Sequence, residues 1–279
     1  VRVLFLGNSF LFGSGSPVRF FGPGTVDDLN RAGVGGVPAL FKAFTVDAGL
    51  AYEVSLETAS GQGFDFHLEK KTSLIGRPWD VVVMQSHSVL NQAKPGDPEL
   101  LIRSARALGE LFARHNPRVD VRLIATWPRA DQVYLEKGAW HGKGLEGMAR
   151  DVRTAYDQAA ATTPQVRGVI PVGESWLRAI RAGFADGNPY DGVSFGQVSL
   201  WTHDHYHGST HGYDIEALMI FGDVTGLDPC SLGKDERVAF ELGVSADQAV
   251  ALQKVAHGEL AAMKRAQPLA PFTPLPGKR

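Results

Sequence analysis

Short apolar runs alternate with amphipathic segments along most of the chain. The runs are rich in β-branched and aromatic residues, and they predict buried strands at residues 1–6, 52–58, 79–85, 119–125 and 166–172. The amphipathic segments place apolar residues at helical spacing. They predict helices at residues 37–48, 64–71, 98–115, 144–162, 175–182 and 246–264.

The alternation of strands and helices predicts an α/β fold, with one mainly parallel sheet and helices on both of its faces. We expect residues 1–267 to form one domain, and residues 268–279, which contain four prolines, to form a disordered tail. Residues 11–38 are rich in glycine and show little periodicity. They predict an irregular loop with a short helical turn around residues 27–32.

Composition excludes several classes of protein. The chain is 44% hydrophobic and 21% charged, so it can bury a substantial core and is not intrinsically disordered. A net charge of −2 gives no global attraction for nucleic acid, and no apolar run approaches the roughly 18 residues of a membrane span. Cys230 is the only cysteine, which excludes an intrachain disulfide. The pattern carries no signal for an oligomeric state.

The first strand begins at Val1 with no preceding segment. We therefore expect an exported protein, periplasmic or secreted, whose N-terminal signal is missing from this sequence. A cytoplasmic protein is the alternative.

Ser9 follows the first predicted strand directly, in the stretch Gly7-Asn8-Ser9-Phe10. Open α/β sheets bind their ligands beyond the carboxyl ends of the strands, so this serine is a candidate nucleophile. A serine hydroxyl is a poor nucleophile near neutral pH and needs an imidazole to take its proton. The alternative is that Ser9 only caps the following turn.

Residues 202–211 contain four of the nine histidines. Asp204 and His207 are three positions apart, and one helical turn would bring a carboxylate against an imidazole, as a serine nucleophile requires. A second hypothesis is a metal site made from Asp204 and two or three of His203, His205, His207 and His211. Their spacing matches no strong zinc signature, so the catalytic dyad is favoured.

These blocks together resemble the SGNH (GDSL-type) hydrolases. Residues 5–10 resemble the first block of the family in a Gly-Asn-Ser form, and residues 204–207 resemble its last block, Asp-x-x-His, followed by a helix at 213–224. Gly61 stands where the family has its second-block glycine. The resemblance implies a flavodoxin-like three-layer α/β/α sandwich that needs no cofactor.

The resemblance also implies roles for individual residues. Ser9 would be the nucleophile, His207 the general base and Asp204 the residue that orients it. The oxyanion hole would use the N–H groups of Ser9 and Gly61 and a side-chain amide. The third block departs from the family, because Gln85-Ser86-His87-Ser88 replaces Gly-x-Asn-Asp. Gln85 is our candidate for the amide, with Asn8 or His87 as alternatives.

We therefore expect a serine esterase that removes a small acyl group, such as acetyl, from a carbohydrate or another small molecule. Asn8, His87, Trp127 and Trp201 are candidate substrate-binding residues, because tryptophan faces suit sugars and acyl chains. An acyltransferase on the same triad is a variant of this hypothesis. The alternatives are a metal-dependent hydrolase centred on His203–His211 and a non-catalytic carbohydrate-binding protein with this fold. We expect no nucleic-acid partner and no membrane insertion.

Overall fold

In a computed structural model, which describes residues 1–266, six strands form one sheet in the order β2-β3-β1-β4-β5-β6. All neighbouring strands are parallel. The apolar residues of β1 are fully buried, and so are those of β4 apart from the partly buried Val81, as their unbroken hydrophobic runs predict. The strands are β1 (Arg2–Gly7), β2 (Asp27–Asp28), β3 (Glu53–Thr58), β4 (Val81–Met84), β5 (Asp120–Ala125) and β6 (Val166–Pro171).

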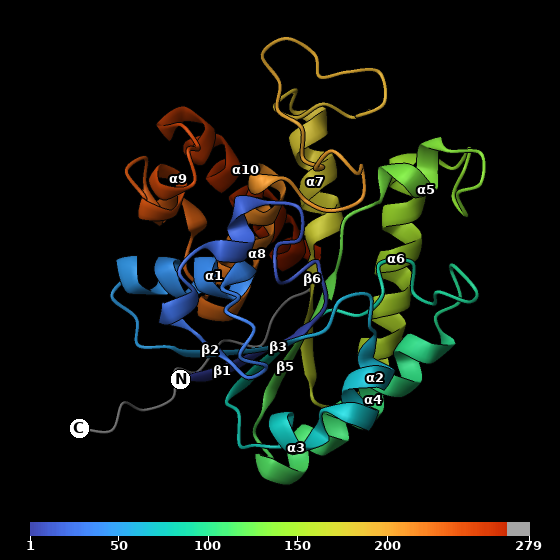
Figure 1. The fold of residues 1–279 in the computed structure, drawn as a ribbon, viewed down its shortest axis with the longest axis vertical. Coiled ribbons are helices and arrows are strands. Elements are labelled where there is room, and N and C mark those ends of the chain that lie inside the picture. Colours follow the sequence, from blue (N-terminus) through green and yellow to red (C-terminus); the bar gives the residue numbers. More distant parts are fainter. Residues whose placement is uncertain (267–279) are drawn as a thin grey trace.

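Helices cover both faces of the sheet (Figure 1). Helices α1, α8 and α10 pack together on one face, and α2, α4 and α6 pack on the other. This arrangement confirms the predicted three-layer α/β/α sandwich. The α-helices are α1 (Gly36–Asp47), α2 (Phe64–Lys70), α3 (Thr72–Ile75), α4 (Glu99–His115), α5 (Ala130–Tyr134), α6 (Gly144–Ala161), α7 (Val172–Arg181), α8 (Thr210–Thr225), α9 (Arg237–Glu241) and α10 (Ala246–Ala266).

Three short 3₁₀ helices complete the described elements: η1 (Pro17–Phe20), η2 (Pro23–Thr25) and η3 (Pro229–Leu232). The predicted helical turn around residues 27–32 is wrong. The chain there forms β2, which pairs with β3. The Asp28 carboxylate accepts the N–H groups of Asn30 and Ala32, so local side-chain bonds replace the helical ones.

The strand order places a topological switch point at β1. The chain leaves β1 towards β3 on one side and later returns to add β4 on the other. Connections that diverge in this way open a crevice at the carboxyl ends of the strands, where doubly wound folds bind ligands. Ser9 follows β1 at this point.

Within residues 1–266, none of the helices combines the length and the apolar character needed to cross a membrane. The predicted proline-rich tail, residues 268–279, lies outside the described residues. The expectation that residues 1–267 form one domain stays a prediction.

Candidate active site

A tight turn after β1 presents Ser9. The Asn8 carbonyl accepts the N–H groups of Leu11 and Phe12, and the Asn8 side-chain oxygen accepts the Phe10 N–H. An asparagine whose side chain accepts a backbone N–H two residues further on stabilises a turn by local hydrogen bonds alone. Ser9 itself is only 3% exposed, so the turn holds its hydroxyl against the protein.

The histidine-rich loop folds as a narrow hairpin. Trp201 and Gly208 form an antiparallel bridge, and the Thr202 N–H donates to the His207 carbonyl. His205 sits at the tip with a φ of +57°, a left-handed conformation in which histidine is one of the better-tolerated residues. The single helical turn considered for this stretch does not form, yet the hairpin brings Asp204 and His207 together.

Ser9, His207 and Asp204 form a continuous hydrogen-bonded chain. His207 Nδ1 lies 2.6 Å from Asp204 Oδ2, and His207 Nε2 lies 2.9 Å from Ser9 Oγ. A carboxylate only accepts hydrogen bonds, so the imidazole proton is on Nδ1 and Nε2 is free to accept the serine proton. Residues that are 198 positions apart therefore meet in the arrangement of nucleophile, base and orienting acid.

The environment of Asp204 keeps its carboxyl ionised. Burial alone would raise the pKa of this group, but hydrogen bonds from His207, Thr202 and the loop backbone outweigh it and lower the pKa well below its usual value. The Thr202 hydroxyl donates at 2.7 Å, and the N–H groups of Tyr206 and His207 each donate at 2.9 Å. A fixed negative charge stabilises the imidazolium that forms when His207 takes a proton.

Buried tryptophans pack against the hairpin and bond to its backbone or to the neighbouring loop. Phe10 stacks on Trp127 with ring centroids 4.3 Å apart, and Trp127 stacks on Trp176 at 4.6 Å. Trp127 Nε1 donates to the Tyr206 carbonyl, and Trp201 Nε1 donates to the Pro128 carbonyl. Trp127 is 0% exposed and Trp201 2%, so neither can offer a face to a ligand. Their assignment as substrate-binding residues is corrected: both support the hairpin that carries Asp204 and His207.

Arg129 and Tyr206 form a contact that the sequence pattern did not reveal. The Arg129 guanidinium lies 3.7 Å from the centre of the Tyr206 ring, and the centre of the His207 ring lies 4.0 Å from the same ring. Two hydrogen bonds to Asp131, of 2.9 and 2.6 Å, hold the guanidinium in place. Tyr206 is thus clamped between a fixed cation and the candidate base.

Tyr213 is a second residue that the sequence did not single out. It is fully buried on α8, and its hydroxyl lies within hydrogen-bonding distance of the carbonyls of Ser9 and Ser14, at 3.3 and 3.0 Å. Burial raises the pKa of this phenol well above its usual value, so it stays protonated. Tyr213 therefore ties the helix after the candidate base to the turn that carries the candidate nucleophile.

Gly61 follows strand β3, the neighbour of β1, and so lies at the same edge of the sheet as Ser9. It has a φ of +69°, and a Cβ at this position would meet open space, so the backbone conformation and not crowding favours glycine. Within the described residues, neither the Ser9 N–H nor the Gly61 N–H donates to a protein acceptor. Both are therefore available as oxyanion donors.

The candidates for the third oxyanion donor make different hydrogen bonds. Gln85 is fully buried, and its amide nitrogen donates one of its two hydrogens to the Ser86 carbonyl. Asn8 donates to the carbonyls of Gln62 and Ser86 and thereby joins the second and third blocks. Asn8 therefore uses both amide hydrogens to hold loops, and the expectation that Gln85 is the third oxyanion donor stays a prediction.

His87 is half-buried beside the loop that carries Gly61. A Cβ placed on Gly63 would lie 2.5 Å from the His87 ring, so this imidazole is packed closely against the second block. Burial lowers the pKa of His87, which favours the neutral ring. Of the three candidates for the third oxyanion donor, His87 alone is left without a side-chain hydrogen bond among the described residues.

A buried polar network anchors helix α2 behind this loop. Glu57 and His67 are both fully buried, and His67 Nδ1 is within hydrogen-bonding distance of the Glu57 carboxylate. Burial alone would raise the pKa of Glu57, but the bond from His67 and the contacts of Asn30 and Lys71 lower it. The pair joins the end of β3 to α2 and so fixes the segment that includes Gly61. The sequence places Glu57 in a strand and gives no sign of this partner.

The remaining histidines of the hairpin do not converge. His205 packs against Tyr190 with ring centroids 4.4 Å apart, His211 lies near Phe184, and His203 is exposed. Within the described residues, the one group of three side chains with metal-binding atoms close together is elsewhere, on η3 and α10. The geometry therefore favours the catalytic dyad over a metal centre in residues 202–211.

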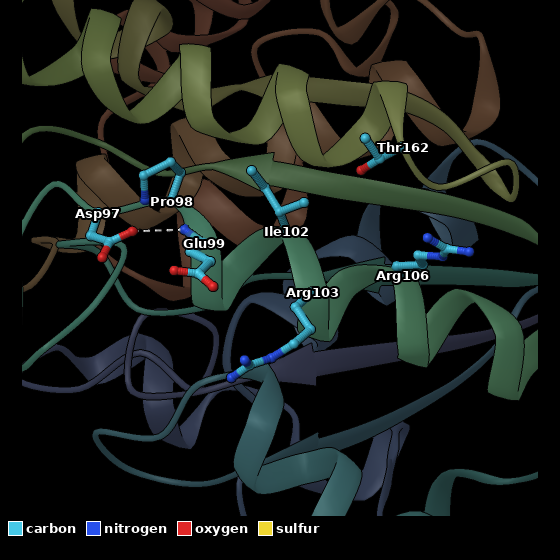
Figure 2. Close-up of a pocket in the computed structure, with 7 residues that line it drawn as sticks. All are labelled: Asp97, Pro98, Glu99, Ile102, Arg103, Arg106 and Thr162. Carbon is cyan, nitrogen blue, oxygen red and sulfur yellow. Dashed lines mark hydrogen bonds between the residues drawn. The ribbon is translucent and has the colours of Figure 1, made fainter.

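A hollow of about 440 Å³ on the surface of α4 is not part of this site. Figure 2 shows its lining, which includes Asp97 and Glu99 at one end and Thr162 at the end of α6. None of its residues belongs to the triad or to the loops around it. The hollow carries no feature of the chemistry described above.

Comparison with known proteins identifies the fold. No protein-family model matches the chain, and no curated protein matches its sequence. A solved DUF4886 family protein from Bacteroides uniformis superposes with a TM-score of 0.60 at 15% identity, covering 94% of this chain and 95% of the other. A GDSL-like lipase candidate from Parabacteroides merdae gives 0.54 at 16% identity, covering 81% and 95%.

A third neighbour is LAE5, an alpha/beta hydrolase enzyme from the metagenome of Lake Arreo in Spain. It superposes with a TM-score of 0.52 at 16% identity and covers 81% of this chain and 94% of its own. These similarities show that the chain has an SGNH (GDSL-type) hydrolase-like fold.

Proposed function

We propose that this protein is a serine esterase that hydrolyses a small carboxylic ester through an acyl-enzyme. One observation carries the proposal: a Ser9–His207–Asp204 hydrogen-bonded chain, with links of 2.9 and 2.6 Å, at the switch point of an SGNH hydrolase-like sheet. The likeness to a GDSL-like lipase candidate supports the same class of reaction.

In the proposed mechanism, Ser9 Oγ attacks the ester carbonyl carbon while its proton passes to His207 Nε2. Asp204 keeps the His207 ring oriented and stabilises its positive charge. The N–H groups of Ser9 and Gly61 bind the carbonyl oxygen as it becomes an oxyanion. His207 then gives the proton to the departing alkoxide. In the second half of the reaction, water attacks the carbonyl of the Ser9 ester, and His207 again acts as the base. His207 then returns the proton to Ser9 Oγ as the acid leaves.

The acyl group in this proposal is small, as in an acetyl ester, and an acetylated carbohydrate is one such substrate. Trp127 and Trp201 do not support a sugar, because both are buried. The proposal therefore depends on the triad and leaves the alcohol part of the ester to be identified by screening. An acyltransferase would use the same acyl-enzyme and differ only in the acceptor.

The test is hydrolysis of p-nitrophenyl acetate by the wild type, Ser9→Ala and Ser14→Ala, each with and without EDTA. We expect Ser9→Ala to lose at least ~10³ of kcat/KM and Ser14→Ala, a matched change in the same loop, to stay within a few fold. EDTA should have no effect.

Two results would overturn the proposal. If Ser9→Ala keeps its activity and EDTA abolishes it, the reaction is that of a metal-dependent hydrolase. If the wild type binds acylated sugars but turns over none of a panel of esters, the protein is a non-catalytic member of the fold. A serine-directed phosphonate gives an independent check, because it should label Ser9 in the wild type alone.

A further inference from the structure

Three side chains of metal-binding type meet where η3 packs against α10, outside the triad and its loops. Asp228 and Cys230 belong to the η3 turn, and His257 belongs to α10, 27 positions after Cys230 in the chain. One ligand atom from each lies within 4.8 Å of the others. No second group of this kind occurs among the residues that the structure describes.

Hydrogen bonds fix two of these side chains. Asp228 caps η3, because its Oδ1 accepts the Cys230 N–H at 2.9 Å, and the Asp228 carbonyl accepts the Ser231 N–H. His257 Nδ1 lies 2.9 Å from the same Asp228 Oδ1, so the imidazole faces the capped turn. Gln253, one turn before His257 on α10, donates to the Gly233 carbonyl at 2.7 Å. The turn and the helix are therefore held in register by bonds outside the three ligands.

The chemistry of the three donors selects the class of ion. A thiolate, an imidazole and a carboxylate together suit zinc and its neighbours in the first transition series, whereas magnesium and calcium prefer oxygen alone. We propose that Asp228, Cys230 and His257 form a binding site for a zinc-class divalent metal ion, with solvent as the fourth ligand.

The proton balance of this site is simple. The Cys230 thiol loses one proton when its sulfur binds the ion. A neutral His257 moves its remaining proton from Nδ1 to Nε2, because Nδ1 becomes the ligand, and its bond to Asp228 is replaced by the two bonds to the metal. The exposed cysteine and the half-exposed carboxylate and imidazole leave the ion open to solvent on one side.

The expected role is structural. Helix α10 packs against α8, the helix that follows the catalytic hairpin, and η3 contacts both helices. An ion that joins η3 to α10 would stabilise this layer when it binds the folded state alone. The inference does not rest on the proposed esterase function.

The experiment uses the full chain, stripped with EDTA and kept reduced. Cobalt(II) chloride is titrated first, because a cobalt–thiolate bond gives a near-ultraviolet charge-transfer absorption. Zinc chloride then displaces it and gives the zinc affinity. We expect one equivalent of cobalt with this absorption and a rise in the thermal midpoint with zinc.

Variants assign the site. Cys230→Ser should abolish the charge-transfer absorption, and Cys230→Ser, Asp228→Asn and His257→Gln should each weaken zinc binding at least about tenfold. Asparagine can still cap η3, so Asp228→Asn separates the lost ligand from a lost fold. His141→Gln, an exposed histidine outside the group, is the control and should bind as the wild type does.

The proposal fails if cobalt gives no thiolate absorption, or if Cys230→Ser and His257→Gln bind zinc as tightly as the control. Asp228 and His257 would then form only a surface ion pair. Ester hydrolysis by Cys230→Ser should equal that of the wild type, so a failure here and a failure of the triad proposal are distinguishable.

Discussion

Asp204 and Asp214 lie ten positions apart in the chain but in opposite environments. Asp204 is in the hairpin, where its side chain is 34% exposed and accepts hydrogen bonds on both oxygens. Asp214 is on α8 and is 1% exposed, and neither of its oxygens has a hydrogen-bond partner among the described residues. The same side chain therefore has opposite pKa shifts in the two places.

The physical cause is the balance between lost hydration and gained hydrogen bonds. At Asp204, donors from the loop outweigh the cost of burial and lower the pKa. At Asp214, burial acts almost alone, and the nearby carboxyl of Glu236 adds to it, so the pKa rises well above its usual value. Glu216, two positions further along α8 and fully buried, also has a raised pKa from burial. The surroundings of the hairpin favour a charged carboxylate, and those of the helix favour neutral acids.

The strongest test of this contrast is one substitution made at both positions. We expect Asp204→Asn to lower kcat for p-nitrophenyl acetate about 10³–10⁴-fold, because an amide cannot hold His207 in the required tautomer. Asp214→Asn should leave kcat within about threefold, because a neutral acid and an amide are similar in size and charge. Equal losses in the two variants would contradict the assignment of Asp204.

The second prediction concerns the pH dependence of stability. Burial raises the pKa of Glu236 to about 7 from a usual value of 4.5. The folded state therefore holds a proton that the unfolded state releases, so stability falls as the pH rises from about 4.5 to about 7. We expect the thermal midpoint to fall by several degrees from pH 5 to pH 8.

The double variant Asp214→Asn/Glu236→Gln should show a smaller fall, because its amides cannot ionise. Glu110→Gln, a change at an exposed glutamate, is the control and should behave as the wild type does. Midpoints measured by differential scanning calorimetry at the two pH values decide the matter. If the midpoint of the double variant falls as much as that of the wild type, these two carboxyls are already ionised in the folded protein.

A smaller effect is expected at the tip of the hairpin. His205 has a φ of +57°, which costs a β-branched residue roughly 1–2 kcal/mol. We expect His205→Val to lower kcat about tenfold by loosening the Asp204 loop, and His205→Asn to lower it less, because asparagine tolerates this conformation. Steady-state kinetics of the two variants provide the measurement. If valine is tolerated as well as asparagine, the backbone of the tip does not position the dyad.

The smallest effect is expected at Thr202, whose hydroxyl donates to Asp204 at 2.7 Å. Thr202→Val removes one of several donors to this carboxylate, and we expect about a threefold loss of kcat and a loss of roughly 1–2 kcal/mol in unfolding free energy. Thr202→Ser keeps the hydroxyl and should restore both. Urea denaturation and kinetics of the pair check this, and a Thr202→Val variant with wild-type values would show that the bond is dispensable.

The catalytic candidates were open to prediction because their signals are local. Ser9 follows an apolar strand and a Gly-Asn pair, and Asp204 and His207 lie close together in the chain. Arg129, Tyr206 and Tyr213 were not found, because their roles depend on contacts between distant segments. Trp127 and Trp201 were misjudged for a related reason: a tryptophan near a sheet edge can point inward or outward, and its position in the chain does not distinguish the two.

By itself, the sequence determined the alternation of strands and helices and the position of a serine at the end of the first strand. These features follow from hydrophobic periodicity and turn chemistry, which act over a few residues. The tertiary structure alone decided the buried partner of Glu57, the raised pKa of Asp214 and the meeting of η3 with α10. Each of these depends on which side chains and how much water surround a group, and only the packing of distant segments sets that.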